Sequence, residues 1–141
     1  MTLNINQLQL EGKNIVIVDD DLPSIRYYET LLKNSGATIN IFHTGQEFVE
    51  YLSEGQPVID LIFMDFLIPF INGIECIRIF RKINRDIPVI MITAYSSEES
   101  KTDAYISGCT EYVLKPIYPE KICYLIDKYL KVTNIPQHLL N

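Results

Sequence analysis

One stretch of the sequence, residues 61–73, constrains what this chain can fold into more than any other. Four large apolar residues run directly into Asp65, and a proline and an Asn-Gly pair follow within eight positions. An apolar run without polar alternation is typical of a strand buried on both faces, as in a parallel sheet. Pro69 and Asn72-Gly73 indicate that a loop comes next. The stretch therefore predicts that Asp65 lies at the carboxyl end of a buried strand, where open α/β sheets place their ligands.

The other elements follow from similar patterns. Apolar runs predict strands at residues 14–18, 87–92 and 111–114, whereas residues 38–42 alternate, which suits an edge strand. Apolar residues at helical spacing predict five helices, which run from Pro23 to Gly36, from Thr44 to Gly55, from Gly73 onward, from Ser96 to Gly108 and after Pro119. Strands that alternate with helices predict the α/β class, with a parallel sheet covered by helices on both faces.

Helix starts carry their own signals. Thr44–Glu47 and Ser96–Glu99 match the Ser/Thr-x-x-Glu pattern and predict capping boxes. Asp21 precedes Pro23 and is predicted to be a plain helix-start carboxylate, because acidic groups favour helix N-termini.

The length of 141 residues fits one domain, which we place at residues 13–131 with a tail or linker at 1–12 and a tail at 132–141. The net charge of −6 argues against a broad surface for nucleic acid or anionic membranes. The start of the sequence lacks a signal-peptide pattern, and no apolar run approaches the ~20 residues of a membrane helix.

Cysteines and histidines add little chemistry. Cys76, Cys109 and Cys123 match neither a disulfide framework nor a zinc motif, so reduced thiols and a cytoplasmic location are expected. His43 and His138 lie outside any motif that would use them, and both are expected to be surface residues.

Polar side chains follow four of the predicted strands. Asp19 and Asp20 come after the first, Asp65 after the third, Thr93 at the end of the fourth and Lys115 after the fifth. The carboxyl ends of parallel strands share one edge, so these side chains should converge. Carboxylates in one pocket repel one another, and a hard cation with oxygen ligands, such as Mg²⁺, removes that conflict. A phosphoryl group could then be held by the ammonium and the hydroxyl while one carboxylate attacks it as a nucleophile.

The combined pattern resembles the receiver domain of two-component response regulators over residues 13–131. The motifs are Val18-Asp19-Asp20, Met64-Asp65 with Pro69 and Asn72-Gly73, Thr93-Ala94, and Tyr112-x-x-Lys115-Pro116. The resemblance implies a flavodoxin-like (CheY-like) sheet with strand order 2-1-3-4-5. It also leaves open whether the chain is a stand-alone regulator or the receiver of a hybrid sensor histidine kinase.

The resemblance further implies how the carboxylates act. Asp65 would be the phosphoacceptor, taking a phosphoryl group from a phosphohistidine of a histidine kinase or a histidine phosphotransfer domain. Asp20 would be the main carboxylate for Mg²⁺, with Asp19 acting partly through water and the backbone carbonyl of Leu67 completing the protein's ligands. Mn²⁺ is expected to substitute. Such a domain promotes its own phosphotransfer and dephosphorylation but is not otherwise an enzyme.

The later strand ends would form the switch. Lys115 would bind phosphoryl oxygens and precede a cis bond to Pro116. The hydroxyl of Thr93 would move toward the phosphoryl group while the ring of Tyr112 turns inward. An output partner would bind residues 97–130, and a phosphorylation-dependent dimer is a further expectation, without contact to nucleic acid or membrane.

Three rival readings remain weaker. A phosphohydrolase with an aspartyl nucleophile would need a second acid where Leu67 stands. A flavin binder would need a polar phosphate loop in place of residues 19–21, and no Gly-x-Gly-x-x-Gly supports a dinucleotide. A degenerate receiver that serves only as an interaction module is the alternative kept here.

Leu67 and Tyr95 flank the pocket as bulky residues, which predicts slow loss of phosphate.

Overall fold

A computed structural model of the chain describes residues 8–55 and 57–131. Five parallel strands form one sheet in the order β2-β1-β3-β4-β5, which confirms the predicted fold class and strand order. The strands are β1 Asn14–Val18, β2 Thr38–Phe42, β3 Leu61–Met64, β4 Val89–Thr93 and β5 Glu111–Leu114. The helices are α1 Leu22–Leu32, α2 Gly45–Ser53, α3 Gly73–Ile83, α4 Glu98–Ser107 and α5 Pro119–Leu130.

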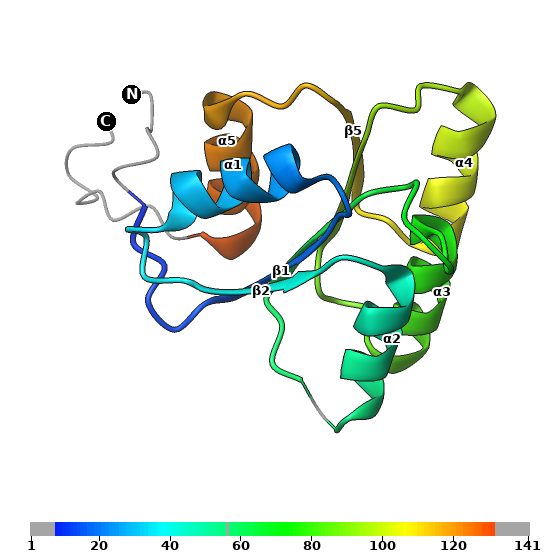
Figure 1. Cartoon of the computed structure of the whole chain (residues 1–141), viewed down its shortest axis with the longest axis horizontal. Helices are drawn as coiled ribbons and strands as arrows, with labels where there is room; N and C mark the ends of the chain where they lie inside the picture. Colours follow the sequence, from blue (N-terminus) through cyan, green and yellow to red (C-terminus); the bar gives the residue numbers. More distant parts are fainter. Residues whose placement is uncertain (1–7, 56, 132–141) are drawn as a thin grey trace.

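The sheet lies between two layers of helices (Figure 1): α1 and α5 cover one face, and α2, α3 and α4 cover the other. Alternate residues of each strand therefore enter two separate cores. In β1, Ile15 and Ile17 pack with α1 and α5, while Val16 and Val18 pack with the helices of the other face. Burial on both faces explains why the central strands lack polar alternation. The edge strand β2 is only half-buried, as its alternation predicted.

Strand β4 begins two residues later than its apolar run predicted. The carbonyl of Ile87 accepts a hydrogen bond from Nη1 of Arg81, on α3, at 2.7 Å. Pro88 has no N–H to donate to a neighbouring strand. Regular pairing therefore starts at Val89, opposite Ile62.

One predicted capping box is largely confirmed and the other is wrong. Oγ1 of Thr44 accepts the N–H of Glu47 at 3.0 Å, although the Glu47 carboxylate accepts from His43 rather than from Thr44. Helix α4, however, is capped by Ser97 and not by Ser96, because Oγ of Ser97 accepts the N–H of Ser100 at 3.0 Å. This register places Ser100 and Ala104 against the core and leaves the two glutamates of the first turn in solvent.

Leu8 and Leu10 pack into the core between the sheet and the α1–α5 layer, although no sequence pattern predicted their burial. The N–H of Leu10 also donates to the carbonyl of Ser35 at 2.7 Å. The boundary at residue 12 stays a prediction, and the tail expected at 132–141 lies outside the described residues. Within residues 8–55 and 57–131, none of the helices is both long enough and apolar enough to cross a membrane.

Candidate functional site

The carboxyl edge of the sheet brings the predicted acidic residues together. Strands β1 and β3 pair with Val18 opposite Met64, so the residues that follow them are neighbours. The N–H of Asp65 donates to the carbonyl of Val18 at 2.9 Å, which fixes the end of β3 against β1. One carboxylate oxygen from each of Asp19, Asp20 and Asp65 lies within 4.8 Å of the others.

Lys115 reaches the same place from the end of β5. Its N–H bonds to the carbonyl of Thr93 at 2.8 Å, and the peptide bond to Pro116 is cis. The Nζ atom donates to Oδ2 of Asp19 and to Oδ2 of Asp65, both at 3.2 Å. Oγ of Ser24, from the first turn of α1, lies 3.5 Å from the same nitrogen. Ser24 was not predicted at this site, because nothing in its local pattern shows that α1 points this residue at Lys115.

The charges of this cluster are not balanced. Burial raises the pKa of the Asp65 carboxyl, and the nearby Asp19 charge raises it further, although Lys115 opposes both effects. Burial alone would lower the pKa of Lys115, but the carboxylates of Asp19 and Asp65 outweigh it and raise that pKa. The ammonium is therefore held firmly in its charged form, yet it does not neutralise the acidic cluster.

The donor set fits a hard divalent cation. All of the grouped ligand atoms are carboxylate oxygens, and Asp20 is exposed while Asp19 is buried, so the cluster opens to solvent on one side. Oxygen donors with few carboxylates are what Mg²⁺ selects. The backbone of Leu67 also borders the cluster, because its N–H bonds to the Asp65 carboxylate.

Thr93 and Tyr112 are joined through the backbone of Tyr95. The buried Oγ1 of Thr93 accepts the N–H of Tyr95 at 3.1 Å. The half-buried Tyr112 donates its hydroxyl to the carbonyl of the same residue. The ring of Tyr95 stacks on that of Phe66, the residue after Asp65, with 5.5 Å between the centroids. Tyr95 therefore connects Thr93 with Tyr112 and with the residue that follows Asp65.

The structure also explains why Asn72 and Gly73 follow the loop after Asp65. Asn72 caps α3, since its Oδ1 accepts the N–H of Glu75 at 3.0 Å. A Cβ on Gly73 would lie 2.3 Å from the carbonyl oxygen of Asp65, so only glycine lets α3 begin this close to the cluster.

Several other residues have ordinary structural roles, as predicted. His43 is exposed and lies 3.6 Å from Glu47, as a surface histidine should, whereas His138 lies outside the described residues. Asp21 caps α1 by accepting the N–H of Ser24 at 3.1 Å. The three cysteines, all described, are buried and unpaired.

Comparison with known proteins identifies the family. The response regulator receiver domain family matches residues 15–127, and the chain belongs to this family. The transcriptional regulatory protein ZraR of Klebsiella oxytoca is 29% identical over 127 residues, which cover 90% of this chain and 28% of that protein. CitT of Halalkalibacterium halodurans is 29% identical over 119 residues, covering 83% of this chain and 52% of that protein. The chain thus spans about a quarter to a half of these relatives.

Solved structures share the fold. A CheY-like receiver domain protein from Methanospirillum hungatei has a TM-score of 0.76 at 26% identity, covering 84% of this chain and 94% of its own. The receiver domain of the sensor histidine kinase PA1611 from Pseudomonas aeruginosa, which has magnesium coordinated in its active site cleft, has a TM-score of 0.75 at 21% identity. The latter covers 85% of this chain and 98% of its own, and at that identity it shows the fold alone.

Proposed function

We propose that the chain is the phosphoacceptor of a two-component phosphorelay, with Asp65 as the residue that is phosphorylated. The observation that carries this proposal is the placement of the Asp65 carboxylate 3.2 Å from Nζ of Lys115 within the cluster formed with Asp19 and Asp20. The donor is a phosphohistidine on a histidine kinase or on a histidine phosphotransfer domain. The free thiols fit a cytoplasmic location, and both a stand-alone regulator and a receiver within a hybrid kinase remain compatible.

The reaction is a transfer between two nucleophiles. A carboxylate oxygen of Asp65 forms a bond to phosphorus as the bond from phosphorus to the imidazole nitrogen breaks, and the electron pair of that bond stays on the nitrogen. Such transfers depend mainly on positioning and on neutralised charge. The ammonium of Lys115 and the hydroxyl of Thr93 then each donate to a phosphoryl oxygen.

A divalent cation would neutralise the negative charge of the carboxylates that Lys115 leaves uncompensated. Asp19, Asp20, Asp65 and the backbone carbonyl of Leu67 would hold Mg²⁺, which when bound neutralises negative charge on the arriving phosphoryl group. Mn²⁺ takes the same oxygen donors and is expected to support the reaction.

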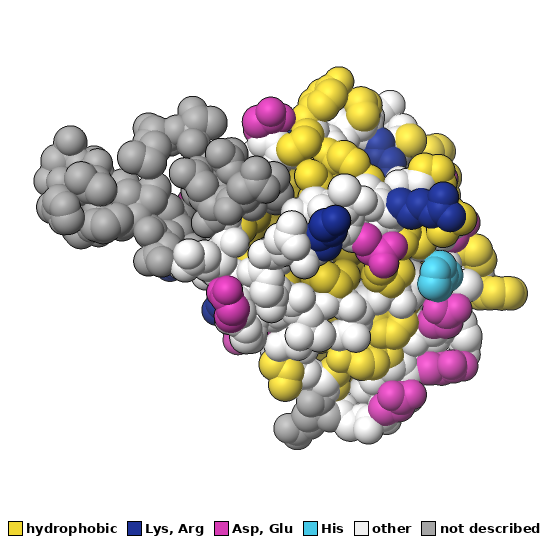
Figure 2. Space-filling view, turned by 60° about the vertical axis from the view of Figure 1, so that its left-hand side comes forward, with side chains coloured by type: hydrophobic (Ala, Val, Ile, Leu, Met, Phe, Trp, Pro, Cys, Tyr) yellow, Lys and Arg dark blue, Asp and Glu magenta, His cyan; other side chains and the backbone are white. Residues whose placement is uncertain are grey.

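The switch connects the site to residues 97–130. When Thr93 turns toward the phosphoryl group, it gives up its bond to the Tyr95 N–H, and Tyr112 is released from the Tyr95 carbonyl. Residues 97–130 offer exposed apolar side chains to an output partner or to a second copy: Tyr105, Ile106, Leu114, Tyr118 and Tyr124. Figure 2 shows mainly another side of the molecule, where hydrophobic side chains also lie in patches between charged ones.

Slow self-dephosphorylation is part of the proposal. Leu67 and Tyr95 carry no group that positions a water molecule for attack on the phosphoryl group. The double substitution Leu67→Asn and Tyr95→Glu should speed decay of the acyl phosphate several-fold. This corresponds to an activation free energy for hydrolysis that is lower by about 1 kcal/mol. Decay that is no faster in the double variant would contradict this assignment.

Phosphorylation with a small donor tests the main proposal. Acetyl phosphate and Mg²⁺ should add a hydroxylamine-labile phosphoryl group to the wild type and none to Asp65→Asn, as followed by intact-mass spectrometry. Equal labelling of both proteins would refute Asp65. Failure to label the wild type would favour the alternative of an interaction module without phosphorylation.

A further inference from the structure

Phe70 combines two features that a folded chain normally avoids. Its side chain is 87% exposed, the largest value among the large hydrophobic residues that the structure describes. Its φ of 70° lies in the left-handed region, which glycine adopts freely and a bulky residue does not. The N–H of Ile71 donates to the carbonyl of Pro69 at 3.0 Å, so Phe70 is the central residue of a strained three-residue turn.

Neighbouring helices hold this turn in place. The carbonyl of Pro69 also accepts the N–H of Gly45, at the start of α2, at 3.3 Å. A Cβ on Gly45 would lie 2.1 Å from the carbonyl oxygen of Ile71, so the two segments touch directly. Sγ of Cys76, on α3, lies 3.8 Å from that oxygen as well. Strain that packing maintains is typical of functional sites rather than of arbitrary loops.

The turn lies at the apex of a loop that begins and ends beside Asp65. The N–H of Gly73 donates to the carbonyl of Phe66 at 2.9 Å and closes the loop at its base. Phe70 is four residues from Phe66 and three from Gly73, so its Cα lies within roughly 14 Å of that base. A transient protein interface of about 600 Å² on each partner has a radius of about 14 Å. A protein whose interface is centred on Asp65 therefore extends far enough to contact Phe70 too.

We propose that Phe70 is a docking anchor, inserted into an apolar depression on the phosphohistidine-bearing protein that phosphorylates Asp65. The inference rests on the proposed function and names the surface by which the donor is selected. Aromatic residues, phenylalanine among them, are enriched in the buried cores of protein interfaces, and the few residues that dominate binding energy lie there. The strained turn keeps the ring available before the donor arrives, which reduces the entropy lost on docking. A small phosphodonor has no surface to receive the ring.

Two variants separate the ring from the turn. Phe70→Ala and Phe70→Gly both remove the ring, but only glycine also relieves the backbone. The protein donor is the phosphorylated histidine phosphotransfer or kinase domain, taken from the source genome, that labels the wild type fastest. At subsaturating donor, both variants should accept its phosphoryl group about tenfold more slowly, because truncating an energetically important interface side chain costs more than about 1 kcal/mol. The rate of labelling by acetyl phosphate should change by less than about twofold, which corresponds to about 0.4 kcal/mol of activation free energy.

A matched control tests whether any exposed apolar residue would do. Val58 is 67% exposed and precedes β3 at the opposite edge of the sheet. Val58→Ala should leave transfer from the protein donor at the wild-type rate. Phe70→Gly should melt above Phe70→Ala by about 3 °C, because only alanine keeps a side chain in the left-handed region.

Several results would overturn the proposal. Wild-type rates of protein-to-protein transfer in both Phe70 variants would remove the anchor. An equal loss with acetyl phosphate and with the protein donor would show that the ring supports the loop instead. A change of mass in light scattering with unchanged transfer would assign Phe70 to contact between copies of this chain. If neither donor labels the wild type at Asp65, the proposed function fails, and this inference fails with it.

Discussion

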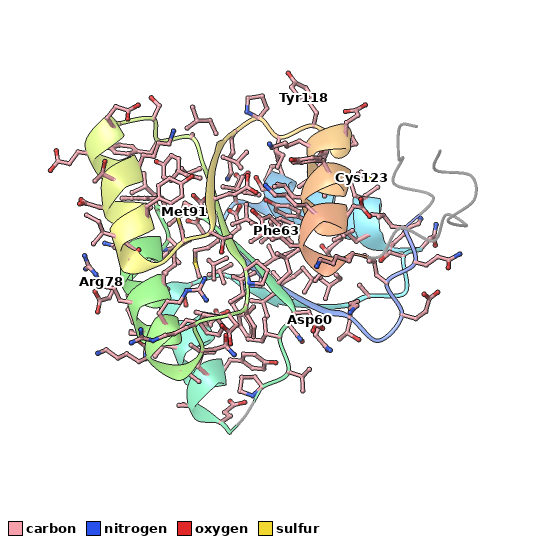
Figure 3. The ribbon with its side chains drawn as sticks, turned by 180° about the vertical axis from the view of Figure 1, so that it is seen from behind. Asp60, Phe63, Arg78, Met91, Tyr118 and Cys123 are labelled. Carbon is pink, nitrogen blue, oxygen red and sulfur yellow. The ribbon has the colours of Figure 1, made fainter. Side chains whose placement is uncertain are left out.

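Acidic residues lie in opposite environments at the two ends of the parallel strands, which we call the amino edge and the carboxyl edge of the sheet. Figure 3 shows Asp60 at one end of the sheet and Tyr118 at the other. At the amino edge, Oδ2 of Asp60 accepts the N–H of Asn14 at 2.7 Å. Oε2 of Glu111 accepts from Nζ of Lys128 at 3.1 Å and from the hydroxyl of Tyr129. Each of these carboxylates has donors of its own and serves the structure.

The carboxyl edge instead gathers three carboxylates, and two of them, Asp19 and Asp65, share the ammonium of Lys115. The pKa values express the contrast. Burial alone would raise the pKa of Glu111, but hydrogen bonds from Tyr129 and Lys128 outweigh it and lower that pKa. Burial and Asp19 raise the pKa of Asp65 despite the nearby Lys115. Charge that the fold leaves uncompensated marks the carboxyl edge as the edge that binds ligands.

The largest expected effect that separates the edges is stabilisation by Mg²⁺. At about 100 times its Kd, a ligand of the folded state alone adds about 2.7 kcal/mol to the free energy of unfolding. Asp20→Asn should lose at least about half of this gain, because it removes a carboxylate from the cluster. Glu111→Gln, at the amino edge, should keep it. Urea unfolding with and without Mg²⁺ measures both, and an equal gain in the two variants would erase the distinction.

Removal of Lys115 should be the next largest effect. Without metal, Lys115→Ala leaves Asp19 and Asp65 facing each other and should lower the free energy of unfolding by about 2 kcal/mol. With Mg²⁺ the loss should shrink, since the cation replaces the missing charge. Labelling of Asp65 should survive, whereas the NMR shifts of Thr93 and Tyr112 on phosphorylation should be lost. A variant that still shows those shifts would remove Lys115 from the switch.

The smallest effect concerns Asp65 itself. In EDTA at pH 7, Asp65→Asn should be more stable than the wild type by about 1 kcal/mol, because the folded state disfavours this charge. Below the ordinary pKa of 3.8, the Asp65 carboxyl is protonated in both the folded and the unfolded chain. In that range the folded state carries no unfavourable charge at Asp65, so the contribution of this proton to the free energy of unfolding is fully present. It is lost as pH rises through the raised value of the folded state. Unfolding curves between pH 4 and pH 7 should therefore diverge, and parallel curves would contradict the raised pKa.

The sequence predicted the carboxyl edge well, because topology alone brings strand ends together. Apolar runs located β1, β3 and β5, and the residues that follow parallel strands share an edge whatever the loops do. The convergence of Asp19, Asp65 and Lys115 could therefore be expected without any knowledge of side-chain packing.

Other features depend on information that a local pattern lacks. Leu8 and Leu10 form too short an alternation to indicate a buried segment, and their burial depends on the distant helices α1 and α5. Ser96 and Ser97 are equally good caps, and only the burial of Ala104 decides between them. The φ of Phe70 contradicts the preference of phenylalanine, so sequence rules point away from it.

Titration with Mg²⁺, followed by ¹⁵N NMR of the wild type, tests the contrast between the edges most directly. We predict saturable shifts in the amides of residues 19–21 and 65–67, with those of residues 60 and 111 left in place. Asp20→Asn should weaken this binding at least tenfold, which corresponds to about 1.4 kcal/mol. Shifts that are absent, or that appear equally at both edges, would contradict the account.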